Sequence, residues 1–132
     1  MKLYYKESSE ETPLVSLNPD KGVLIIDGNC NLEEPEFFFN GISNWINKYS
    51  KNPYESTVLT INLASINISS SKFLLNIIYQ LEKIHKKGND VKIRWVYNND
   101  EDGNFELGND YAEMVSLPFE FIETVQNFMT SI

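Results

Sequence analysis

The chain has 132 residues and carries a formal net charge of −8 at pH 7, with 11 Lys plus Arg against 19 Asp plus Glu. This length suits a single domain, residues 1–132, because two separate cores would each be too small to be stable without metals or disulfides. The acidic balance argues against a nucleic-acid partner, since phosphate backbones are bound by clustered basic faces.

Three strands are predicted in the first quarter of the chain. Residues 3–5 and 14–17 are strand-prone, and the polar run 7–12 between them is typical of an exposed hairpin loop. Residues 23–26 form a short apolar run between two glycines. Such a run predicts a strand that is buried on both faces in the middle of a sheet.

A helix is predicted to begin at Pro35, which suits the first helical position, and to end at Asn52 and Pro53. Its apolar stripe at helical spacing consists of Phe38, Ile42, Trp45, Ile46 and Tyr49. Residues 58–63 then alternate between apolar and more polar side chains, which predicts a strand with one face more buried than the other.

A second helix is predicted after the serines at 69–71, whose hydroxyls can cap its start, and Gly88 suits its end. Its stripe consists of Leu74, Ile77, Ile78, Leu81 and Ile84. Alternating residues 91–97 predict the next strand. A strand, helix and strand of these lengths imply parallel pairing with a right-handed connection, so the sheet as a whole should be mixed.

The rest of the chain is less regular. Residues 98–110 are polar and acidic and predict a loop, residues 111–115 a short helical turn, and residues 121–129 a terminal helix with Ile122, Val125 and Met129 on one stripe. Oxygen-bearing side chains in the loop leave open an alternative function, a divalent-metal or small-ligand module using residues 100–110. The glycine spacing differs from that of an EF-hand calcium loop, so a solvated acidic loop is favoured.

Catalysis is difficult to build from these residues. The only histidine, His85, lies beside lysines near the predicted end of the second helix, where it suits the helix dipole. The sequence contains no glycine-rich phosphate loop, nucleophile elbow or histidine-containing metal motif, and we therefore expect neither an enzyme nor a cofactor or metal.

Cys30 is the only cysteine and cannot form a disulfide within the chain. With no apolar run long enough to cross a membrane, we expect a cytoplasmic protein.

The segment Asn67-Ile68-Ser69-Ser70-Ser71-Lys72, between a strand and the second helix, is the most informative part of the sequence. A phosphate on Ser69 or Ser70 would lie at the positive end of the helix dipole and would add a charge of about −2 to a surface that a partner can recognise. From spacing alone, helix capping and turn formation by the serines is the favoured explanation. These six residues are our candidates for partner binding, and Ser69 and Ser70 for phosphorylation.

At this junction the chain resembles the SiaC family of regulatory phosphoproteins, whose fold is related to that of the SpoIIAA-like anti-sigma factor antagonists. The residues that carry the resemblance are Gly28, Glu33-Glu34-Pro35, Trp45, Tyr49, Asn67, Ser69-Ser70-Ser71-Lys72, Val91-Lys92-Ile93-Arg94-Trp95 and Leu117-Pro118-Phe119, together with the acidic loop. The resemblance implies an α/β fold of the STAS-like kind, a mixed central sheet with helices mainly on one face.

The resemblance also implies a non-enzymatic, partner-switching protein. Such a protein is phosphorylated by a Ser/Thr kinase, restored by a PP2C-type phosphatase, and binds a downstream target such as a diguanylate cyclase. Similar members carry a threonine acceptor where this chain has Ile68, which lacks a hydroxyl. Ser69 is the nearest substitute, although one position along a helix turns a side chain by about 100°. Two outcomes stay open: Ser69 or a neighbour is the acceptor, or the protein binds its partner without phosphorylation.

Overall fold

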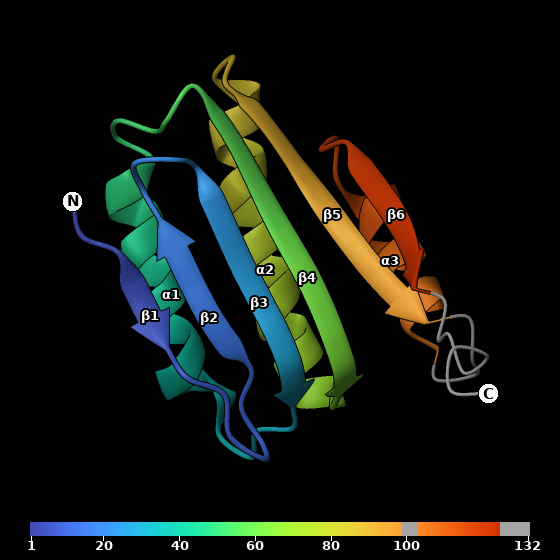
Figure 1. Ribbon diagram of the computed structural model, residues 1–132. Helices are drawn as coiled ribbons and strands as arrows, with labels where there is room; N and C mark the ends of the chain where they lie inside the picture. Colours follow the sequence, from blue (N-terminus) through green and yellow to red (C-terminus); the bar gives the residue numbers. More distant parts are fainter. Residues whose placement is uncertain (99–102, 125–132) are drawn as a thin grey trace, which may run out of the picture.

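The computed structural model describes residues 1–98 and 103–124, which form one six-stranded sheet and three helices (Figure 1). The strands are β1 (Tyr4–Lys6), β2 (Leu14–Asn18), β3 (Val23–Cys30), β4 (Ser56–Ile66), β5 (Asp90–Asn98) and β6 (Phe119–Thr124), and the helices are α1 (Pro35–Tyr49), α2 (Ile68–Lys86) and α3 (Asn104–Met114). The strands lie in the sheet in the same order as in the sequence.

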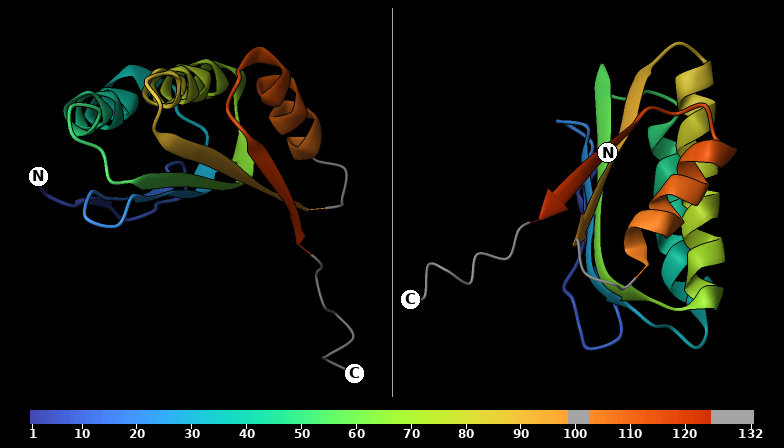
Figure 2. Two further views of the ribbon diagram at one scale, coloured as in Figure 1. Left: turned by 90° about the horizontal axis from the view of Figure 1, so that it is seen from above. Right: turned by 90° about the vertical axis from the view of Figure 1, so that its right-hand side faces the viewer.

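The sheet is mixed, as the sequence predicted. The strands β1, β2 and β3 pair antiparallel through two hairpins, and β3, β4, β5 and β6 pair parallel. Each parallel connection contains a helix, and all three helices cover the same face of the sheet (Figure 2). The predicted fold class, a mixed central sheet with helices on one face, is therefore confirmed.

The core lies between that face and the helices. In β3, β4 and β5, alternate side chains point toward the helices and most of these are buried, for example Ile26, Ile61 and Trp95, which lie opposite one another in register. The predicted burial of residues 23–26 on both faces is wrong, because Val23 is 42% exposed on the uncovered face. An apolar run marks a buried strand, but it does not show whether a second layer covers it.

The predicted terminal helix at residues 121–129 is also wrong where the structure describes it. Residues 119–124 form β6, which pairs with the end of β5. The two-residue alternation of Phe119 and Phe121, which both pack against the core, was the competing signal. Val125 and Met129 lie outside the described residues.

The loop predicted at residues 98–110 is shorter than expected, because α3 begins at Asn104. The buried stripe of α3 consists of Asn104, Gly108 and Tyr111, and so contains too few apolar residues to predict a helix. Gly108 is required by packing: a Cβ atom there would lie 2.5 Å from Nε1 of the Trp95 indole. In the described part of the chain, no helix combines the length and apolarity needed to cross a membrane.

Candidate functional site

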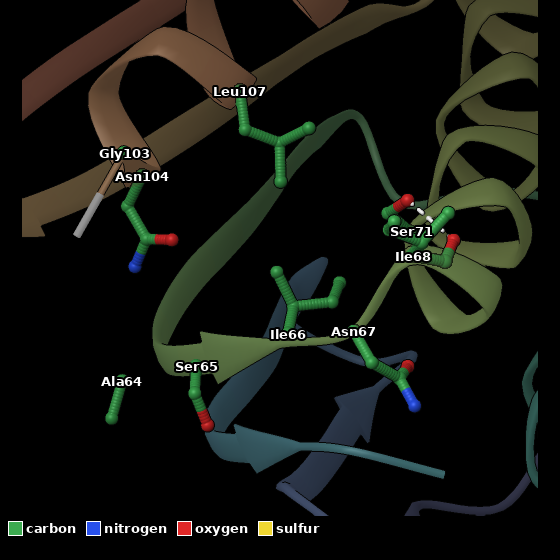
Figure 3. A pocket seen from close by; sticks show the side chains of 9 residues that line it. All are labelled: Ala64, Ser65, Ile66, Asn67, Ile68, Ser71, Gly103, Asn104 and Leu107. Atoms are coloured by element: carbon green, nitrogen blue, oxygen red, sulfur yellow. Dashed lines mark hydrogen bonds between the residues drawn. The ribbon is translucent and has the colours of Figure 1, made fainter. Parts of the chain in front are cut away.

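A pocket of about 310 Å³ opens at the carboxyl end of the parallel strands, where β4 ends and α2 and α3 begin (Figure 3). This is the edge at which open α/β sheets most often bind ligands, because the loops and helix N-termini meet there. Leu107 of α3 and Ile66 of β4 both line the opening. The full lining is Ala64, Ser65, Ile66, Asn67, Ile68, Ser71, Gly103, Asn104 and Leu107.

Asn67 is the N-cap of α2, so the prediction that the serines provide this cap is wrong. Its Oδ1 accepts a hydrogen bond of 3.0 Å from the backbone N–H of Ser70, and its Nδ2 donates one of 2.8 Å to the carbonyl of Leu32. The first bond satisfies a free N–H of the helix start, and the second ties this start to the loop before α1. Asparagine at this position therefore orders two segments at once.

Ser70 points into the protein and is completely buried. Its Oγ accepts a hydrogen bond of 3.3 Å from the backbone N–H of Leu32 and also contacts the thiol of Cys30. Burial raises the pKa of Cys30, while the hydrogen bond from Ser70 opposes this rise, so the thiol stays protonated and inert at neutral pH. A phosphate on Ser70 would require the junction to open.

The helix α3 is fixed against the start of α2 by Tyr111. The phenol of Tyr111 donates a hydrogen bond to the carbonyl of Ser71, and the Oγ of Ser71 donates one of 2.7 Å to the carbonyl of Ile68. Burial raises the pKa of Tyr111, so the phenol remains a neutral donor at physiological pH. The two helices that border the pocket are thus held at a defined separation.

Asn104 completes the rear of the pocket, and sequence reasoning had not singled it out. The Nδ2 of Asn104 donates a hydrogen bond to the backbone carbonyl of Leu63 in β4. The backbone carbonyl of Asn104 accepts a hydrogen bond of 2.9 Å from Nε1 of Trp95. Gly103, with a φ of 79°, provides the turn that directs Asn104 inward. The only signal in the sequence was this Gly-Asn pair, which is typical of turns in general.

Three of the six predicted junction residues face outward. Ile68 is 79% exposed, although it is a large apolar residue, and Ser69 and Lys72 are exposed beside it on the first turn of α2. Asn67 and Ser70 instead bond to Leu32 in the loop before α1, and the Oγ of Ser71 bonds back to the carbonyl of Ile68 in its own helix turn. The first turn of α2 contains no acidic residue, so the partial positive charge of the helix start is not neutralised by its own side chains.

The acidic-loop alternative has no support from the described residues. Residues 104–110 belong to α3, and residues 100–102 lie outside the described part of the chain. Within residues 1–98 and 103–124, no three His, Cys, Asp or Glu side chains come together as a metal site.

His85 lies near the opposite end of α2, where its Nδ1 is 3.3 Å from the carbonyl oxygen of Asn89. It is therefore far along the helix from the pocket at the junction. In the described part of the chain, the pocket lining offers backbone groups, amides, hydroxyls and apolar surface but no titratable acid or base. Such a lining suits recognition of another molecule rather than acid–base catalysis.

The fold is that of a small α/β domain with a pocket at one end of its sheet. The SiaC family regulatory phosphoprotein profile matches residues 6–124, and the chain belongs to this family. The family is one of regulatory phosphoproteins, and the chain is accordingly a regulatory protein. The resemblance seen in the sequence is thus confirmed.

The chain is also similar to individual proteins of Pseudomonas aeruginosa. An uncharacterized protein of Pseudomonas aeruginosa strain UCBPP-PA14 is 26% identical over 111 residues, which cover 84% of this chain and 88% of the relative. The crystal structure of apo-SiaC from Pseudomonas aeruginosa has a TM-score of 0.84 at 25% identity, covering 92% of this chain and 99% of that one. A chain in the crystal structure of the diguanylate cyclase SiaD with its activator SiaC, from the same species, has a TM-score of 0.85 at 24% identity and the same coverage.

Proposed function

We propose that this protein is a cytoplasmic, single-domain regulator that binds and activates a diguanylate cyclase through the junction at residues 67–72. The relative SiaC is described as the activator of the cyclase SiaD, with which it forms a complex. The match of the whole fold to SiaC supports a similar target for this chain. A Ser/Thr kinase and a PP2C-type phosphatase complete the proposed system, because the family is one of phosphoproteins.

The observation that carries the proposal is the exposure of Ile68 at the edge of the pocket. Its side chain is 79% exposed, yet its backbone is held by α2, Ser71 and the Asn67 cap. Burial of an isoleucine side chain in a partner would contribute about 1.5–3 kcal/mol to binding. Because the side chain is presented from an ordered helix, little additional entropy is lost when it is buried.

Ser69 is the residue through which we propose that phosphorylation controls binding. It is exposed at the second position of α2, whose first turn has no acidic residue, and Lys72 follows three positions later on the helix. A phosphate there would be stabilised by the helix dipole and by Lys72. It would also place about two negative charges beside Ile68, in the surface that a partner must bury.

The binding proposal is tested by co-purifying the protein with diguanylate cyclases of its own host and measuring cyclic di-GMP synthesis with and without it. We expect stimulation by the wild type and a loss of about tenfold or more in affinity for Ile68→Glu, which places a charge where an apolar contact is buried. Met114→Glu is the matched control, since Met114 is also exposed, at 53%, but lies at the other end of α3. Glutamate suits a helix start, so unfolding would not explain the loss.

Equal stimulation by Ile68→Glu and the wild type would place the contact elsewhere, and the absence of stimulation for every host cyclase would reject the target. The regulatory part is tested separately by intact-mass spectrometry of the protein purified from its host. One added phosphate that fragmentation assigns to Ser69 supports control at this residue. A host protein that stays unmodified under all growth conditions supports a binder that acts without phosphorylation.

A further inference from the structure

A second groove of about 310 Å³ lies between the C-terminal halves of α1 and α2, at the opposite end of α2 from Ile68. The two helices run side by side on the covered face of the sheet (Figure 2). The groove is lined by Ile46, Asn47, Ser50, Gln80, Lys83, Ile84, Lys86 and Lys87.

The base of this groove is ordered. Ile46 and Ile84 are each 1% exposed and belong to the core. Above them, Nε2 of Gln80 donates hydrogen bonds of 3.2 Å to the carbonyl of Ser43 and of 3.0 Å to Oδ1 of Asn47. These bonds hold the two helices at a fixed distance, so the groove exists before any partner binds.

The charge on these two helices is opposite to that of the chain as a whole. The helix α1 carries Lys48 and Glu36, and α2 carries Lys72, Lys83, Lys86 and Glu82, so the two helices together carry +2 in a protein with a net charge of −8. Three lysines, Lys83, Lys86 and Lys87, line the groove, and all three lie in or just after the last turn of α2.

Most of this positive charge has no internal partner. The carboxylate of Glu82 accepts a hydrogen bond of 2.7 Å from the backbone N–H of Ser116 and lies 3.8 Å from Nζ of Lys86. Within the described residues, neither Lys83 nor Lys87 has a carboxylate within 4.0 Å. A helix dipole accounts for a cation in the last turn of α2, but it does not require three lysines to line one groove.

We propose that this groove binds an acidic segment of a protein partner. Carboxylates of that segment would pair with Lys83 and Lys87, and the segment would lie along the groove between α1 and α2. The surrounding negative charge of the protein disfavours the approach of acidic molecules at other faces, so the groove also selects the orientation in which such a partner approaches. This contact is independent of the junction at Ile68.

The probe for the test is a synthetic peptide of twelve residues in which Asp and Glu flank two leucines. It is titrated into the ¹⁵N-labelled full-length protein, and amide chemical shifts are followed by NMR. We expect shifts at residues 46–50 and 80–87, and weaker binding as salt is added. A peptide with lysine in place of the acids is the charge control, and we expect it to leave these amides unchanged.

The double variant Lys83→Gln with Lys87→Gln should bind the acidic peptide about tenfold more weakly, because two exposed ion pairs are lost. Lys2→Gln with Lys21→Gln is the matched control, since it removes the same charge from exposed lysines outside the groove, and its affinity should stay within about twofold. Ile68→Glu should leave peptide binding unchanged, which separates this test from that of the cyclase contact.

If the two double variants lose the same affinity for the acidic peptide, the loss is explained by overall charge alone and the proposal is overturned. Equal binding of the lysine peptide, or shifts confined to other residues, would also overturn it. Sedimentation with phosphatidylserine vesicles provides the remaining comparison. If the vesicles bind through Lys83 and Lys87 while the acidic peptide leaves the groove amides unmoved, the surface recognises a membrane and the proposal is wrong.

Discussion

The two ends of α2 differ in how they present a surface, although a pocket of about 310 Å³ borders each of them. At the N-terminal end, polar side chains such as Asn67 are used up in internal hydrogen bonds, and the apolar Ile68 is left exposed. At the C-terminal end, apolar side chains are buried and lysines are exposed. One helix thus offers a short-range apolar contact at one end and a longer-range charge at the other. The apolar contact would contribute to the affinity for a partner, and the charge would set the orientation in which a partner approaches.

The largest effect is expected at Gly108, because α3 forms one wall of the N-terminal pocket only as long as it can pack on Trp95. In Gly108→Ala the new Cβ would lie 2.5 Å from the indole Nε1, and both groups are buried. We expect the free energy of unfolding to fall by about 3 kcal/mol, as measured by urea denaturation. Glu106→Ala, on the exposed side of the same helix, should change it by less than about 0.5 kcal/mol.

This pair of variants also tests the comparison between the ends of α2. Gly108→Ala should weaken cyclase binding at the N-terminal pocket while leaving the acidic peptide at the lysine groove unaffected, after correction for the unfolded fraction. Equal weakening at both surfaces would mean that the two ends do not act independently.

The next effect concerns the residues that terminate α2. Asn67→Ala removes the cap of Ser70 and the bond to Leu32, and should cost about 2 kcal/mol of unfolding free energy. Asn89→Ala removes a bond of 3.1 Å to the carbonyl of Ile84 at the other end and should cost about 1 kcal/mol. Thermal or urea unfolding of both variants measures the difference. Equal costs would show that the start of α2 is no more strongly fixed than its end.

The parts of the fold that could be predicted from the sequence are those in which apolar periodicity decides. Leu74, Ile77 and Ile78 fall on a helical stripe, and Leu59 and Ile61 alternate, because one side of each element faces the core. The sheet order and the placement of helices on one face then follow from the strand–helix–strand units and the resemblance. The sequence predicted only the last turn of α3, within residues 111–115. The rest of this helix was missed, because its inner stripe of Asn104, Gly108 and Tyr111 packs through a missing side chain and a hydrogen bond.

The candidate site was only partly predictable for a related reason. The sequence singled out the junction at residues 67–72, three residues of which line the pocket, but the separate placement of its serines depends on direction: Ser70 points inward and Ser69 outward. A run of three serines contains no information on where the helix begins, and a change of one position would exchange these roles. The second wall of the pocket comes from Leu107, about 40 positions along the chain from Ile68, and no local pattern links the two.

A smaller effect is expected for Glu82, the only carboxylate on α2. The hydrogen bond from the backbone N–H of Ser116 lowers its pKa, so the folded state binds this proton less tightly than the unfolded state. The associated stability is therefore fully present above the ordinary pKa of 4.5 and is lost as the pH falls through the lower folded value.

Glu82→Gln should cost about 1 kcal/mol at pH 7 and less in acid, which is measured as the free energy of unfolding between pH 7 and pH 2.5. Glu113→Gln, on an exposed residue, is the control with an unchanged pH profile. Because the change makes the lysine groove more positive, binding of the acidic peptide should strengthen slightly. If Glu82→Gln lowers the free energy of unfolding by the same amount at every pH, the negative charge of Glu82 does not contribute to stability.

The smallest change in stability is expected for Ser69→Asp, and it has the opposite sign. A carboxylate at the second position of α2 faces the unneutralised helix start, so unfolding free energy should rise by about 0.5 kcal/mol at pH 7. The gain should vanish as the pH falls through the lowered pKa of the new carboxylate. Ser69→Asn, similar in shape but uncharged, should show neither the gain nor its pH dependence.

If the N-terminal end of α2 is the partner contact, Ser69→Asp should nevertheless weaken cyclase binding, because charge is added beside Ile68 where the partner must exclude water. A more stable protein that binds less well cannot be explained by misfolding, whereas a more stable protein that binds equally well would remove Ser69 from the interface and leave Ile68 to act without phosphate control.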